Sequence, residues 1–313
     1  MSKGNKAAAV LELSGLGALL RRRPPWRGVL LLNHHRVGDG TRWSTGRDVW
    51  SATAEQLDDQ LDFLARNFDL IRPEDLVDVL HDPRARAVGI TFDDGYRECY
   101  EIAYPILRAH GAAAVFFLTT GFLDGVRTAW WDEITWMAGP SREASVASLV
   151  AHYKTLPDRR AEDFLDYLAE ATGSGRRDPA ASQSEWLTWE MVREMRSGGM
   201  SMGAHTVNHP VLARHGRDTQ HAEIVGSIER IAEEIGERPA LFSYPDGTRG
   251  SFDGTSRDLL DESGVRLAFS NYGGIAQPGR WDPYDIPRIS LGHQMTRHRF
   301  RGIATLPLQL HYH

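Results

Sequence analysis

One short stretch, residues 90–96 with the sequence Ile-Thr-Phe-Asp-Asp-Gly-Tyr, constrains this chain more than any other. β-Forming apolar residues alternate up to Phe92, whereas Asp-Gly is typical of a turn. We therefore expect a strand that stops at Asp93 or Asp94 and delivers both acids to a loop. Neighbouring strand side chains point to opposite faces, so at a strand end the two acids can take separate tasks, one on a metal and one on a proton. By itself, the same pattern also fits a hairpin turn with solvated acids.

A second stretch, residues 202–210, carries two histidines four positions apart, His205 and His209. At that spacing two imidazoles can share one side of a helical turn. Histidine together with a carboxylate is the usual ligand set of a catalytic zinc site, which keeps one position open for water. The pair therefore predicts a metal site if the fold brings it to the paired acids.

Together the two stretches resemble the first two motifs of the polysaccharide deacetylases, the NodB-homology family known as carbohydrate esterase family 4. The resemblance covers roughly residues 28–292. It implies that Asp93 is the general base and that Asp94, His205 and His209 hold one divalent metal. We expect Zn²⁺, with Co²⁺, Ni²⁺ or Mn²⁺ as alternatives.

Composition agrees with an ordinary globular protein, because 41% of the 313 residues are hydrophobic and 25% are charged. The formal net charge of −6 argues against nucleic acid as a partner, because phosphate binding needs a basic surface. The single cysteine, Cys99, fits a reducing compartment. We expect a cytoplasmic protein.

The first 27 residues form an expected N-terminal extension with a short amphipathic helix at Val10–Leu20. It is a poor signal peptide because Glu12 interrupts the run and the arginines at 21–23 follow it. No run approaches the ~20 apolar residues of a membrane span. The arginines could contact an anionic membrane surface, but a solvated helix end is the favoured interpretation. Residues 301–313 are expected to be a polar C-terminal tail.

Strand-like and helix-like segments alternate through one expected domain, residues 28–300. This order predicts the α/β class, and an incomplete, distorted parallel barrel of about seven strands is favoured over a doubly wound sheet because the polar motifs follow strand ends. The family resemblance implies the same barrel. The expected strands lie near residues 28, 88, 113, 200, 241, 267 and 286.

The alternation lapses at about residues 120–187, which we interpret as an insertion. Trp130, Trp131 and Asp132 lie there in an expected loop. Adjacent tryptophans can be a packing anchor or a platform for a sugar face, and barrel loops commonly shape substrate access. Trp131 and Asp132 are therefore candidate substrate contacts.

A third family motif is recognisable around Pro245, but Ser243 and Asp246 replace the arginine and the tyrosine that the family carries there. In the family, the backbone N–H at the tyrosine position stabilises the oxyanion, and a backbone donor survives a side-chain change. Asp246 can therefore still supply it. Tyr244 and Pro245 are further candidate substrate contacts.

Loss of the motif arginine matters more, because the family uses it to orient the base and balance its charge. Arg288, at another expected strand end, can replace it, although pairing with a surface acid is an equal alternative. Two histidines compete as general acid. His35 is favoured because His-Arg-Val matches a family branch that places the acid there, while His293 resembles the usual branch's leucine-x-histidine motif.

Three functions follow as hypotheses. The leading one is a metal-dependent hydrolase that removes N-acetyl groups from the amino sugars of a polysaccharide or other glycan. An alternative is a cytoplasmic N-deacylase of a small-molecule or lipid-linked sugar. The third is a catalytically degenerate, carbohydrate-binding barrel, which the altered third motif favours and the intact acid and histidine set opposes.

Overall fold

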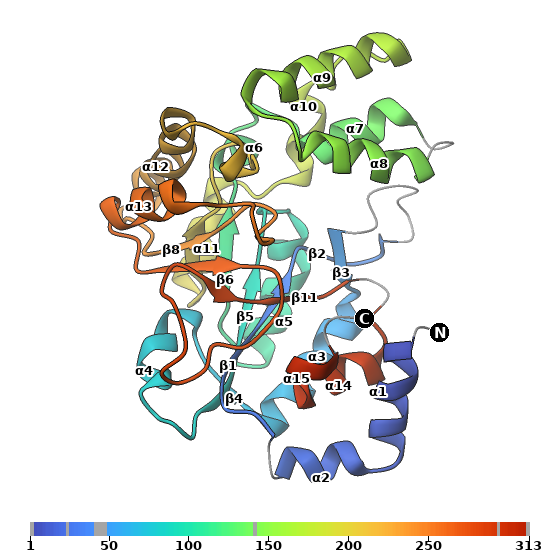
Figure 1. The fold of residues 1–313 in the computed structure, drawn as a ribbon, viewed down its shortest axis with the longest axis vertical. Coiled ribbons are helices and arrows are strands. Elements are labelled where there is room, and N and C mark those ends of the chain that lie inside the picture. The colour runs from blue at the N-terminus through green and yellow to red at the C-terminus, as the bar shows by residue number, and fades with distance from the viewer. Residues whose placement is uncertain (1–2, 23–24, 41–48, 140–142, 293–294, 311–313) are drawn as a thin grey trace.

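The computed structural model describes residues 3–22, 25–40, 49–139, 143–292 and 295–310. Its centre is a parallel sheet curved into a nearly closed barrel (Figure 1). Along the barrel the strands run in the order β10, β9, β8, β7, β6, β5, β1, β11. Their bounds are β1 Gly28–His34, β5 Arg86–Phe92, β6 Val115–Leu118, β7 Ser201–Ala204, β8 Leu241–Ser243, β9 Leu267–Ser270, β10 Ile286–Pro287 and β11 Ile289–Ser290. The expected α/β class and distorted parallel barrel are confirmed.

The barrel has eight strands because the last expected strand is divided in two. β10 pairs with β9, whereas β11 pairs with β1, so one segment joins both edges of the sheet. Pro287 lacks an N–H and suits a strand end. Between the pieces, the Arg288 amide donates to Ser270 O at 3.2 Å, and its side chain is fully buried.

Helices connect the strands and cover the barrel's outside (Figure 1). Thr and Gln three residues apart predict a capping box, and Thr53 and Gln56 form one at the start of α3. Gly236, as a helix-ending glycine predicts, adopts the left-handed conformation that ends α12. Pro105 lies in the first turn of α5, directly after a π-helical turn at Cys99–Ala103, where its missing N–H costs no helical hydrogen bond. The connecting helices are α3 Ala54–Asn67, α4 Leu76–Leu80, α5 Tyr104–Ala109, α11 Trp189–Ser197, α12 Arg217–Ile235 and α13 Gly254–Glu262. Short strands β2 Arg36–Val37 and β3 Trp50–Ala52 pair separately, and β4 Asp69–Leu70 pairs with β5.

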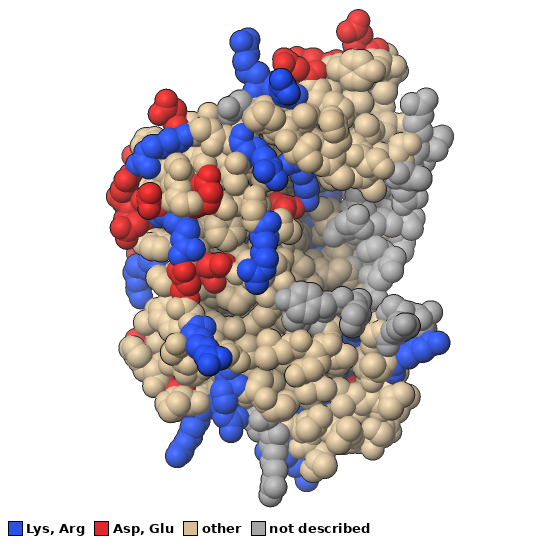
Figure 2. Space-filling view, in the orientation of Figure 1, with Lys and Arg blue, Asp and Glu red and all other residues tan. Residues whose placement is uncertain are grey.

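The insertion forms a helical layer over one end of the barrel (Figure 1). Its helices are α6 Thr120–Leu123, α7 Trp130–Ala138, α8 Glu143–Tyr153, α9 Asp158–Thr172 and α10 Pro179–Ser182. The expected loop at the paired tryptophans is wrong, because Trp130 and Trp131 begin α7. Trp130, Ile134 and Met137 recur at helical spacing and pack on α9 in a separate small core. The face in Figure 2 is hollowed below this layer.

The N-terminal region contains two helices rather than one, α1 Lys3–Leu13 and α2 Leu16–Arg22, separated at Gly15. The expected polar tail is largely helical, with α14 Arg297–Thr305 and α15 Pro307–Leu310. Ala8 and Leu11 share a buried cluster with Phe300 and Ile303, so the two ends of the chain pack together beside the barrel. Within the described ranges, no helix is long and apolar enough to span a membrane.

Candidate metal centre and active site

Parallel strands bring the two acidic side chains and the two histidines to one end of the barrel. Asp93 and Asp94 directly follow β5, and His205 directly follows β7. Asp94 lies at φ 74°, a left-handed conformation that aspartate tolerates better than most residues. This turn lets both carboxylates reach the same cavity although neighbouring strand side chains would diverge.

Asp94, His205 and His209 form a compact group of candidate metal ligands. Asp94 Oδ1 lies 3.5 Å from His205 Nε2 and 3.5 Å from His209 Nε2, and one ligand atom from each residue lies within 4.8 Å of the others. In the part of the chain that the structure describes, this buried oxygen has no hydrogen-bond donor. An unpartnered buried carboxylate oxygen facing two imidazole nitrogens fits a divalent metal.

The hydrogen bonds and burial of both histidines suit metal binding. His205 Nδ1 lies 2.7 Å from Ser243 O, so it donates to that carbonyl and leaves Nε2 free as a ligand. Burial lowers the pKa of His209 to about 3, and its imidazole is therefore neutral at pH 7. Neutral imidazole is the form that coordinates metals.

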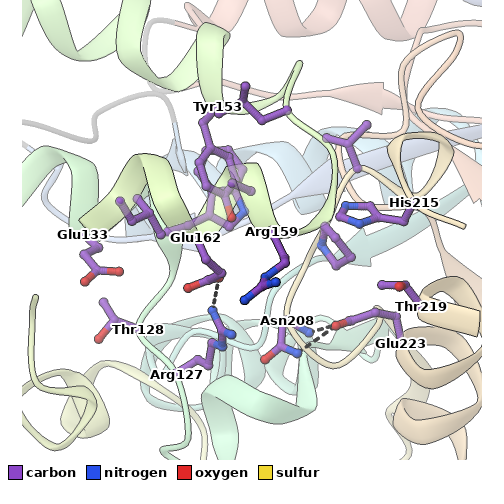
Figure 3. Close-up of a pocket in the computed structure, with 16 residues that line it drawn as sticks. Arg127, Thr128, Glu133, Tyr153, Arg159, Glu162, Asn208, His215, Thr219 and Glu223 are labelled. Atoms are coloured by element: carbon purple, nitrogen blue, oxygen red, sulfur yellow. Dashed lines mark hydrogen bonds and ion pairs between the residues drawn. The ribbon is translucent and has the colours of Figure 1, made fainter. Parts of the chain in front are cut away.

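The two histidines do not share a helical turn, and that expectation is wrong. They lie on a loop in which Thr206 and His209 have φ values of 65° and 58°. Glu223 of α12 holds this loop by accepting hydrogen bonds from Val207 N at 3.0 Å and Asn208 N at 2.7 Å. Its carboxylate also accepts from the Asn208 side chain at 2.7 Å (Figure 3). These hydrogen bonds offset the free-energy cost of holding two residues in the left-handed backbone conformation.

Sequence reasoning missed Glu223, although a signal for it existed. The residue is 9% exposed and lies on the buried stripe of α12 beside Ile224. A carboxylate among apolar helix positions predicts a polar partner, because buried acids are almost always paired. Trp130 adds support on the other side, since its indole N–H donates to His209 O at 3.0 Å.

Asp93 is held by an ion pair with Arg288. The guanidinium Nη1 and Nη2 donate to the two carboxylate oxygens at 2.8 Å each, and Asn33 Nδ2 donates at 2.9 Å. Burial alone would raise the pKa of Asp93, but the charge and hydrogen bonds of Arg288, together with the nearby histidines, outweigh burial and hold that pKa below its ordinary value. Arg288 is fully buried, so it does not pair with a surface acid. Sequence reasoning also missed Asn33, although a polar residue inside the apolar strand β1 indicates a buried polar partner.

Ser243 occupies the position at which the family carries its motif arginine. Its hydroxyl accepts from Arg288 Nη2 at 2.7 Å and lies 3.3 Å from Asp93 Oδ2, to which it can donate. The small side chain leaves space for a guanidinium that arrives from another strand. The structure therefore brings Arg288 to the carboxylate that the family's arginine would serve.

A cavity of about 430 Å³ opens over Asp93 and the three candidate ligands, and His35 lines it. The preceding residue, His34, points instead into the protein, stacked on Phe92, where burial lowers its pKa to about 4. Alternation along β1 thus presents His35 to the cavity. His293, the competing candidate for general acid, lies outside the described residues.

Asp246 and Tyr244 also line the cavity. The Asp246 carboxylate is engaged by Lys154, a residue that sequence reasoning missed, and by Thr248. Its backbone lies at φ 62°. The Tyr244 side chain is directed elsewhere, because its ring stacks on Phe252 and its hydroxyl donates to Tyr284 O at 3.0 Å.

Trp131 borders the cavity, whereas Pro245 and Asp132 are not among the lining residues. The Trp131 ring meets the His209 ring edge-on at 4.7 Å, and its N–H donates to Tyr96 Oη at 2.9 Å. Asp132 lies behind it, 3.5 Å from the same hydroxyl, and burial raises its pKa to about 7.

Comparison with known proteins gives a family match. The family model described as polysaccharide deacetylase matches residues 81–268, which contain Asp93, Asp94 and both histidines. The Bacillus subtilis (strain 168) protein YxkH, provisionally named a polysaccharide deacetylase, is 20% identical over 218 residues. That match spans 70% of this chain but only 56% of the relative.

Several solved structures share the fold. A Streptococcus pyogenes deacetylase, PplD, in complex with acetate has a TM-score of 0.59 at 20% identity, covering 87% of this chain and 95% of that one. A de-N-acetylase from Aggregatibacter actinomycetemcomitans has a TM-score of 0.58 at 19% identity, covering 86% and 96%. IcaB from Ammonifex degensii has a TM-score of 0.59 at 19% identity, covering 89% and 96%.

Proposed function

This chain belongs to the polysaccharide deacetylase family, and on that premise we propose that it is a metal-dependent hydrolase that removes N-acetyl groups from the amino sugars of a glycan. The observation that carries the proposal is the placement of Asp93 beside Asp94, His205 and His209 in one cavity. A base next to a metal site is what amide hydrolysis by water requires.

Asp94, His205 and His209 would hold one divalent ion, with Zn²⁺ preferred for this ligand set. Such an ion, when bound, supplies Lewis-acid polarisation and lowers the pKa of water. Asp93 is ionised at neutral pH because Arg288 stabilises its charge, so it can accept a proton from the attacking water. Arg288 also orients the carboxylate through two parallel bonds.

The remaining steps use groups around the same cavity. As water adds to the acetamide carbon, the backbone N–H of Asp246 would donate to the developing oxyanion. His35 would then give a proton to the sugar nitrogen as the carbon–nitrogen bond breaks, and the products are acetate and a free amine. Asp93 receives one proton and His35 loses one, so the protonation states must be reset before the next turnover.

A second candidate keeps this chemistry but acts in the cytoplasm on a small-molecule or lipid-linked sugar. The single cysteine and the layer formed by α7 and α8 over the cavity favour it, since a long glycan needs an open groove. A degenerate binding barrel is the weaker alternative, because a module that only binds glycan needs neither an arginine-paired Asp93 nor a metal group.

Acetate release tests the proposal. Wild-type protein loaded with Zn²⁺, Co²⁺, Ni²⁺ or Mn²⁺ would be incubated with chitin oligomers, peptidoglycan fragments and nucleotide sugars. We expect metal-dependent acetate release from at least one class, and release about 10²–10⁴-fold slower from Asp93→Asn. Stoichiometric metal without acetate release from any acetylated substrate would contradict the hydrolase and favour the binding barrel.

A further inference from the structure

The cavity over the candidate metal site has an aliphatic wall. Helix α8 contributes Val146, Ala147 and Val150, which lie on one face at positions i, i+1 and i+4. Val49, which precedes β3, adds another aliphatic side chain. Three of these four side chains belong to the inserted helix α8, and none lies at the strand ends that carry the reacting groups.

Three polar side chains near this wall are already engaged. Lys154, one turn beyond Val150, forms an ion pair with Asp246. The Trp131 N–H donates to Tyr96 Oη, and the Trp130 N–H donates to a backbone carbonyl. Sugar hydroxyls packed against these side chains would lose water without gaining equivalent partners, which is costly.

Neither tryptophan is well placed as a sugar platform. Trp130 is 5% exposed, and its ring is stacked on Tyr153 at 4.3 Å. Trp131 packs edge-on against both Phe122 and His209. Trp131 lines the same cavity as the aliphatic wall and contacts the candidate ligand His209. An aliphatic chain of a substrate that lies on the wall would therefore begin beside the reacting amide.

We propose that this wall binds an aliphatic chain carried by the amino-sugar substrate. The inference rests on the proposed deacylase function and deepens it, because it makes the substrate an amphipathic amino sugar rather than an internal unit of a polar polymer. The chain can be a long N-acyl group or an alkyl group attached to the sugar, and both present the same surface to the wall.

Binding to the metal-loaded Asp93→Asn protein tests this without turnover. Calorimetry would compare methyl N-acetylglucosaminide, octyl N-acetylglucosaminide and methyl N-octanoylglucosaminide below their micelle concentrations. Two buried methylenes are worth about tenfold in affinity, so a chain with four buried methylenes should bind about 100-fold tighter than the methyl glycoside. Whichever of the two long-chain ligands binds tighter shows whether the aliphatic chain is carried on the glycosidic oxygen or on the nitrogen of the sugar.

Valine variants in the same background locate the chain. Val150→Asn and, separately, Val146→Asn should each remove most of the advantage of the octyl ligand while leaving affinity for the methyl glycoside within about threefold, because the added amide disfavours apolar contact. Val126→Asn is the matched control, since Val126 is 68% exposed and outside the cavity. Circular dichroism checks that each variant is folded.

The possible outcomes separate this inference from the proposed function. Equal affinities for all three ligands would overturn the aliphatic site even if wild-type protein releases acetate. So would long-chain ligands that still bind both valine variants more tightly than the methyl glycoside does. Tight, valine-dependent binding of an octyl ligand would support the site, and failure of wild-type protein to release any acyl group would then count against the hydrolase alone.

Discussion

Arg288 and Asp93 form a fully buried, two-point ion pair across 195 residues of sequence, with both nitrogen–oxygen distances at 2.8 Å. The pair exists because the last strand segment divides between the two edges of the barrel and turns Arg288 inward. Ser243 completes it with a hydroxyl instead of the motif arginine. The positive charge of Arg288, which lies between β10 and β11, thus stabilises the carboxylate of Asp93, which follows β5.

Replacing Arg288 should change the pH dependence of turnover. Asp93 acts only when ionised, and Arg288 lowers its pKa. Arg288→Gln removes the largest of the charges that oppose the effect of burial, so the pKa of Asp93 should rise and the acid limb of kcat/KM should move to higher pH by about 1 unit or more. Arg288→Lys, which keeps the charge, should move less. Superimposable acid limbs for all three proteins would show that this pair does not tune the base.

Removing either histidine should abolish metal binding and activity together, because His205 and His209 supply two of the three candidate ligands. Metal content of purified His205→Ala and His209→Ala would be measured by atomic absorption. His110→Ala is the control, since His110 pairs with Asp58 away from the cavity. Full metal occupancy in His205→Ala would refute the assigned ligand set.

Asp93→Asn should leave metal content unchanged but greatly slow turnover, because an amide cannot accept the proton from water. A loss of about 10²–10⁴-fold in kcat is expected for a missing general base. Metal analysis and acetate release on the same preparation would check both halves. Normal hydrolysis by this variant would exclude Asp93 as the base.

Glu223 should control metal affinity without touching the metal. Glu223→Ala removes the acceptor that holds Val207 and Asn208, and we expect affinity to fall about 10–100-fold, as for other outer partners of ligands. Competition with a chromogenic chelator measures this. Glu229→Ala, on the exposed face of the same helix, is the control. Equal affinities in both variants would mean that the loop holds its shape unaided.

The general acid can be identified by comparing His35→Ala and His293→Ala with one acetylated substrate under saturating metal. His35 lines the cavity, so its loss should lower kcat by about 10²–10⁴-fold with little change in binding. Loss of His293, if it only borders the site, should alter KM more than kcat. A large kcat defect confined to His293→Ala would reverse the assignment.

Local patterns predicted most regular elements correctly because each depends on a few neighbouring residues. The capping box at Thr53 and the glycine stop at Gly236 are examples. Trp130 was misplaced in a loop because its helix, α7, follows Ala129, which provides no side-chain cap, so the acidic residues of the first turn were the only start signal. The His205–His209 spacing was misread as helical because positive φ values there depend on a carboxylate from α12.

By itself, the sequence determined the chemical inventory and its local setting: adjacent acids after an apolar strand, two histidines after another, and alternating strands and helices that form a parallel barrel. Only the tertiary structure decided that Arg288 reaches Asp93, that Glu223 holds the histidine loop, and that α8 lays aliphatic side chains over the cavity. The physical reason is the sequence distance over which each kind of signal acts. Periodicity and turn chemistry report the backbone state of nearby residues, whereas these contacts depend on strand order and register across the whole barrel.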